Sequence, residues 1–126
     1  MTDTEFIEAF EACTLPSSEF HHRHHVRLAF LLFQREPFIQ AAEHFIVSLK
    51  RYAASLDATG LYHETITWAY LVSIHERIAR SASADWETFA VANGDLFEKT
   101  FLERYYKPET LKSDLARRVF VMPDRA

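Results

Sequence analysis

Residues that interrupt regular structure are scarce in this chain, which has only two glycines and four prolines among its 126 residues. The segments between these breakers are long, whereas a sheet of many strands needs frequent turn signals. Long uninterrupted segments favour helices. We therefore expect an all-α fold, a bundle of about four main helices followed by a shorter helical C-terminal part.

The length and the apolar content of the chain suit one domain. Hydrophobic residues make up 48% of the sequence, and eleven phenylalanines supply large apolar area for a core. No internal repeat, low-complexity segment or linker divides the chain. We expect residues 1–126 to form a single helical domain.

Hydrophobic spacing and capping signals place the helices. A short first helix follows Thr2 or Thr4, and a second covers about 22–34 and stops before Pro37. The third, over 38–56, is the clearest, and a fourth covers 63–82 after a turn at Gly60. The expected buried stripe of the third helix consists of Ile39, Ala42, Phe45, Ile46, Leu49 and Ala53.

The C-terminal part has the signals of shorter helices. Asp85 is a candidate N-cap, Asn93 with Gly94 ends the helix that follows, and Pro108 suits the first turn of another helix. The tail over 121–126 is expected to be extended.

Charge and cysteine content exclude several classes of function. A formal net charge of −4 and a pI near 5.9 provide no broad basic surface, so neither nucleic acid nor a membrane surface is an expected partner. The single cysteine, Cys13, rules out an intramolecular disulfide framework. The acidic N-terminus does not resemble a secretion signal, and no apolar run reaches the roughly 20 residues of a membrane span. We expect a soluble cytoplasmic protein, for which a homo-oligomer is possible.

Four of the seven histidines lie within residues 21–25, at the start of the second helix. On a helical wheel His25 lies on the apolar side, so we expect it to be more buried than His24. His22 precedes His25 by three residues and His21 precedes it by four, and either pair can converge on one ion. The wheel does not choose between the two pairs.

A metal site needs a third ligand from another helix, and the segment "YHETIT" over 62–67 offers His63 and Glu64. Neighbouring residues of a helix point about 100° apart, so we expect one of the two to be a ligand and the other to act as general base or to orient the ligand. His75 is too far along the same helix to share the site.

Three segments together carry a resemblance: "HHRHHV", "YHETIT" and "LERYYKPETLKSDLARRVFVMPD". This combination resembles a family of small uncharacterised bacterial proteins with a TH-x-x-HL-type motif and a YHETIT box. The resemblance implies His22 and His25 as the histidine pair, with His21 and His24 at variable positions. Tyr62 and Tyr106 lie within the shared segments and are candidate pocket residues. The resemblance implies a pocket but no particular reaction.

The first hypothesis for function is an open metal site formed by His22, His25 and His63. Imidazole ligands suit Zn, Fe, Ni or Cu as a divalent transition metal. With zinc, Glu64 would take a proton from the bound water in a hydrolysis, and with iron an oxygenase becomes possible.

Two other classes of protein remain open. One is a non-enzymatic module in which a His/Glu network binds a small molecule or stabilises the bundle. The other is a helical interaction protein, with residues 120–124 as a contact.

Overall fold

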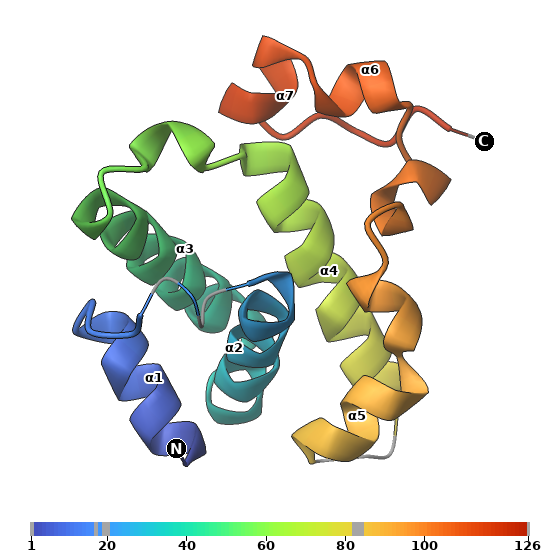
Figure 1. The fold of residues 1–126 in the computed structure, drawn as a ribbon. Helices are drawn as coiled ribbons and strands as arrows, with labels where there is room; N and C mark the ends of the chain where they lie inside the picture. Colours follow the sequence, from blue (N-terminus) through green and yellow to red (C-terminus); the bar gives the residue numbers. More distant parts are fainter. Residues whose placement is uncertain (1, 17, 19–20, 82–84, 126) are drawn as a thin grey trace.

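The computed structural model describes residues 2–16, 18, 21–81 and 85–125, and within them the chain is all-α with no strand. Part of the segment over 15–20, which joins the predicted first and second helices, lies outside the described residues, as does Ala82 at the end of the predicted fourth helix. The four longer helices are α1 (Asp3–Glu11), α2 (His22–Arg35), α3 (Phe38–Ser55) and α4 (Glu64–Arg80) (Figure 1). The shorter ones are η2 (Thr59–Leu61), α5 (Trp86–Ala92), η3 (Gly94–Phe97), η4 (Phe101–Arg104), α6 (Pro108–Leu111) and α7 (Asp114–Arg118). None of the described helices is long and apolar enough to cross a membrane.

The predicted helix ends are confirmed where their signals are local. Thr2 caps α1 in a capping box with Glu5, each side chain accepting a hydrogen bond from the other residue's backbone N–H. The carboxylate of Asp85 accepts from the backbone N–H of Thr88 at 3.0 Å and caps α5. Pro108 is the first residue of α6.

The core is one hydrophobic cluster centred on α2, which packs against α1, α3, α4 and α5. Phe10 from α1, Phe30 from α2 and Phe89 from α5 are fully buried in it. In Figure 1 α1, α2 and α3 lie side by side, α4 runs along the other side of α2, and α6 and α7 lie beside the start of α4. The first turn of α2 therefore faces the middle of α4.

The buried stripe of α3 differs from the predicted one. Phe45 is buried as expected, but Ile39 is 67% exposed, whereas Ser48 and Tyr52 are buried. The hydroxyl of Tyr52 donates to the backbone carbonyl of Leu15 at 2.5 Å, which satisfies its polar atom inside the core. The predicted stripe, chosen by hydrophobic spacing, omitted Tyr52 and Ser48. It is therefore rotated around the helix axis relative to the observed buried face of α3.

The extended tail is held against the start of α4 by side-chain hydrogen bonds. Thr65, fully buried, donates to the carbonyl of Val119 at 2.8 Å and accepts from the N–H of Val121 at 3.0 Å. The hydroxyl of Tyr106 donates to the carbonyl of Val121 at 2.7 Å. These contacts fix the C-terminal part next to the residues that open α4.

Candidate functional site

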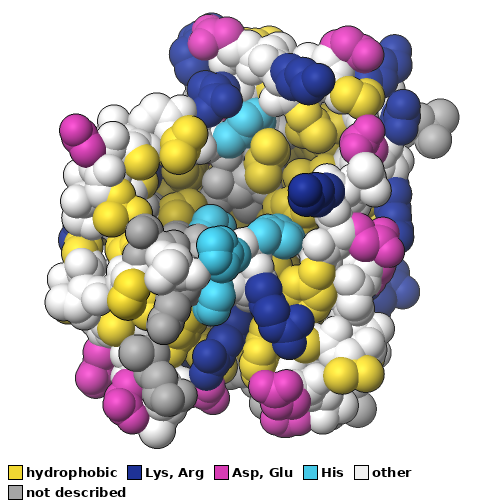
Figure 2. Space-filling view, in the orientation of Figure 1, with side chains coloured by type: hydrophobic (Ala, Val, Ile, Leu, Met, Phe, Trp, Pro, Cys, Tyr) yellow, Lys and Arg dark blue, Asp and Glu magenta, His cyan; other side chains and the backbone are white. Residues whose placement is uncertain are grey.

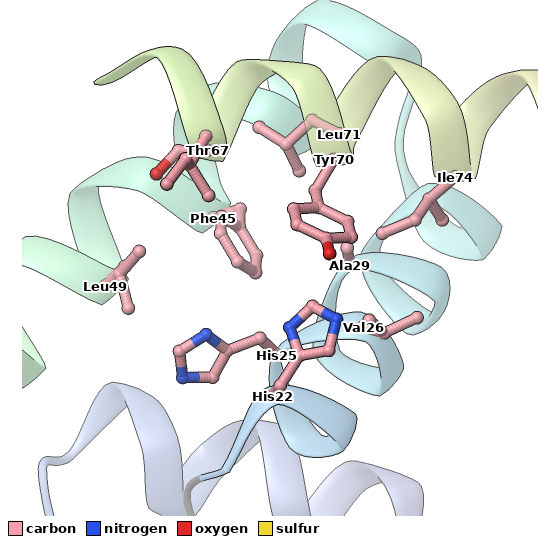
Figure 3. Close-up of a pocket in the computed structure, with 11 residues that line it drawn as sticks. His22, His25, Val26, Ala29, Phe45, Leu49, Thr67, Tyr70, Leu71 and Ile74 are labelled. Atoms are coloured by element: carbon pink, nitrogen blue, oxygen red, sulfur yellow. The ribbon is translucent and has the colours of Figure 1, made fainter. Parts of the chain in front are cut away.

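Three adjoining hollows lie between α2, α3, α4 and the C-terminal part, and Ile66 borders all of them. The inner cavity, about 80 Å³, lies between the first turns of α2 and the middle of α4 (Figure 3). The side cavity, about 340 Å³, lies between α3 and the start of α4, and the mouth, about 720 Å³, opens toward η3, η4 and α6. Figure 2 shows the hollowed face, with hydrophobic side chains inside it and histidines on opposite sides. We call the three hollows together the cleft.

His22 lines the inner cavity and the mouth. Its Nε2 lies 2.9 Å from the carbonyl oxygen of Leu96, and because a carbonyl only accepts, Nε2 carries the proton and donates. Its ring meets that of Tyr70 edge to face, with centroids 4.6 Å apart. His22 therefore ties the start of α2 to η3 and to the middle of α4.

His25 borders the inner and side cavities. Burial, reinforced by the neighbouring charges of His22, His24 and His21, lowers its pKa to about 4, so the ring is neutral at pH 7. His24 and His25 are both half-buried, so the predicted difference in their burial stays a prediction. They differ in surroundings: the Nδ1 of His24 accepts from the backbone N–H of His21 at 3.0 Å and its ring faces α1, whereas His25 faces the cleft.

His63 is the N-cap of α4, and both of its ring nitrogens are engaged. Nδ1 accepts from the backbone N–H of Ile66 at 3.0 Å, so Nε2 carries the proton and donates to the carbonyl of Leu111 at 2.7 Å. A metal ligand needs a free nitrogen lone pair. His63 has none to offer in this arrangement, and its ring instead joins the start of α4 to α6.

The three predicted ligands do not converge on one point. His22 packs against Tyr70, which lies seven residues after His63, roughly 10 Å along the helix axis. Among the described residues no group of three or more His, Cys, Asp or Glu side chains is arranged to hold a metal. The residues predicted to bind a transition metal therefore do not fit one together.

Glu64 contacts a tyrosine. The hydroxyl of Tyr62 donates to its Oε1 at 2.6 Å, and burial together with this carboxylate raises the pKa of Tyr62 well above its usual range. The Nζ of Lys50 lies 4.7 Å from the centre of the Tyr62 ring. Tyr62 borders the side cavity, as a pocket residue should, whereas Tyr106 lies in the core and holds the tail.

Tyr70 and Thr67 are polar residues of the inner cavity that were not among the site residues predicted from the sequence. Burial raises the pKa of Tyr70 to about 12, and Figure 3 shows its hydroxyl directed into the space beside His22. Thr67 donates to the carbonyl of His63, one turn earlier in the chain, at 2.7 Å. The available signal was their helical spacing with Ile66 and Ile74, which places all four on the side of α4 that faces the cleft.

The chain matches no protein-family model, no curated protein and no solved structure. The resemblance to small bacterial proteins therefore stays a prediction. What the cleft can bind is inferred from the residues that line it.

His44 lies outside the cleft and joins three helices. Its Nε2 is 2.5 Å from Glu11 at the end of α1, and its Nδ1 is 2.9 Å from Glu36 at the end of α2. Carboxylates only accept, so both nitrogens donate when the ring is an imidazolium. Burial alone would lower the pKa of His44, but the bonds to Glu36 and Glu11 outweigh it and raise the pKa. Glu43 and Arg51 are the other charged residues around it.

Because the folded-state pKa of His44 is raised, its contribution to stability is present below pH 6.5 and is lost as the pH rises through the folded value. We expect the change to be below about 1 kcal/mol, since the pair is a third exposed. Urea denaturation between pH 6 and 8.5 should show this decline in the natural chain and a flatter profile in His44→Gln. His75→Gln is the control, because His75 packs on the rings of Phe33 and Phe38. Identical profiles for the natural chain and His44→Gln would contradict the assignment.

Proposed function

We propose that the protein binds a small, mainly apolar molecule in the cleft between α2, α3 and α4. The observation that carries this proposal is the set of three adjoining hollows around Ile66, two of them between the main helices. Ligand sites are typically concave and apolar, with a few polar groups that orient the ligand. The cleft has this composition.

The polar groups inside the cleft suit hydrogen bonding to an uncharged part of a ligand. His25 is neutral at pH 7 and so brings no charge into the cleft, and the Tyr70 hydroxyl stays protonated and can donate or accept a hydrogen bond. Both groups border the inner cavity. A ligand that enters this cavity exchanges water for apolar walls and meets the Tyr70 hydroxyl, from the middle of α4.

The contacts of His63 and Glu64 favour binding over metal-dependent catalysis. His63 uses both nitrogens in the frame of α4, and Glu64 orients Tyr62. A general base has to reach a proton of the substrate, and a metal ligand has to offer a lone pair. The His/Glu network therefore serves to shape the cleft that holds the ligand.

A substitution that fills the side cavity with a larger side chain tests the proposal. Ala53 is half-buried in the wall of this cavity, whereas Ala54 is exposed on the same helix. We expect Ala53→Phe to weaken binding of the neutral dye N-phenyl-1-naphthylamine at least tenfold, measured by fluorescence titration, because the ring fills the space. Ala54→Phe, the matched control, should bind like the natural chain. Absence of dye binding to the natural chain, or equal affinities of the two variants, would refute the proposal.

A further inference from the structure

Resting on the proposed function, we infer that the ligand is an amphiphile with one carboxylate, whose apolar chain enters the cavities while the carboxylate stays at the mouth between Lys99, Lys112 and Arg117. The mouth and the two cavities meet at Ile66. We take the ligand to pass Ile66 and to reach from the mouth into both cavities.

The mouth has more available positive than negative charge. Lys99, Lys112 and Arg117 line it and are exposed, and none of them makes an ion pair among the described residues. Figure 2 shows Lys or Arg side chains beside the hollow. These cations are free to pair with a negatively charged group.

The backbone of the mouth also fixes one of these cations. Arg117 donates from Nη1 to the carbonyl oxygens of Gly60 at 2.9 Å and Tyr62 at 3.4 Å. This places its guanidinium over the turn before α4 without neutralising its charge. Its remaining N–H groups can donate to a carboxylate.

Two glutamates also line the mouth, and they offset these cations only in part. Glu98 lies 3.8 Å from Arg104, which is itself paired with Asp95. Glu103 is the second. The formal balance of the lining residues, three cations against two carboxylates, still favours an anion at the mouth.

The orientation of the ligand follows from the inner walls. His25 is the titratable side chain shared by the inner and side cavities, and it is neutral at pH 7. An ionised carboxylate buried there would lose its hydration without gaining an opposite charge, which is costly. The carboxylate therefore stays at the mouth and the methylene chain lies inside.

Chain-matched probes separate the two parts of this inference. We expect octanoate to displace N-phenyl-1-naphthylamine about fivefold more tightly than 1-octanol at low salt, which corresponds to two exposed ion pairs. The advantage should shrink as salt is raised, because exposed charges are screened. Among alkanoates and among 1-alkanols of increasing length, each added methylene should tighten binding up to about fourfold, since the chain lies in an apolar cavity.

Removal of the charges at the mouth provides the second measurement. The double variant Lys99→Gln/Lys112→Gln should bind octanoate severalfold more weakly and bind 1-octanol unchanged. Lys107→Gln is the control, because Lys107 is exposed but does not line the mouth. Equal binding of octanoate and octanol, without salt dependence, would overturn the assignment of the carboxylate and leave the apolar cleft standing. Failure of both series to bind and displace the dye would overturn the proposed function as well.

Discussion

Replacement of Thr65 by valine is expected to lower the free energy of unfolding by about 2 kcal/mol, because it removes a donor and an acceptor from the fully buried anchor of the tail. Valine has nearly the same shape, so the core keeps its packing. The carbonyl of Val119 and the N–H of Val121 lose their partners. Urea denaturation should detect the loss, and hydrogen exchange of the Val121 amide should become about thirtyfold faster.

Thr67→Val is the matched control, since Thr67 is buried two residues later in the same helix. Its hydroxyl donates to the carbonyl of His63, which already accepts from the backbone N–H of Thr67, so we expect a change below about 0.5 kcal/mol. Equal effects of the two substitutions would mean that the tail is not anchored through Thr65. Both variants keep the N-cap that His63 provides.

The anchor at Thr65 also bears on the cleft. α6 and α7 supply one wall of the mouth, and they are held to the start of α4 by Thr65 and by the donation of His63 to Leu111. A tail released from Thr65 would loosen this wall while leaving the inner cavity between α2 and α4 intact. Binding of octanoate should therefore suffer more than binding of the neutral dye.

The sequence predicted the helices well because their signals are local. The caps at Thr2 and Asp85, the stop before Pro37 and the start at Pro108 all depend on residues within one turn. The face of α3 was harder to predict. Burial of Tyr52 depends on a carbonyl 37 positions away, which no periodic pattern contains.

The candidate site was predicted only in part for the same reason. Helical spacing identified His25 and left His21 and His22 as alternatives, and the resemblance implied His22. Both His22 and His25 line the cleft. The role of His63 depends on Leu111, and that of Glu64 on the hydroxyl of Tyr62, so neither is visible in a pattern of metal ligands. Lys99 and Lys112 lie outside the long helices, so hydrophobic periodicity could not assign them to the mouth.

The neutral state of His25 has a consequence for acid stability. The folded chain takes up a proton at this ring only near pH 4, whereas an unfolded chain does so near pH 6.5. The unfolded state therefore binds more protons between these values, and stability falls as the pH is lowered through this range. We expect this residue alone to cost about 2 kcal/mol between pH 6.5 and 4.5, because its ring is only partly exposed.

His25→Gln should remove this acid sensitivity, because glutamine does not titrate, and denaturation midpoints measured from pH 7 to 4.5 should fall less steeply in the variant. His75→Gln, at an exposed position whose charge does not act on His25, serves as the control and should retain the full slope. Below pH 6.5 the stabilising contribution of His44 is already present, so in that part of the window the slope reports on His25, and the two histidines act on stability on either side of pH 6.5. An NMR titration in which the His25 ring protonates near pH 6.5, with equal slopes in both variants, would show that the ring is hydrated and that the inner cavity is open to water.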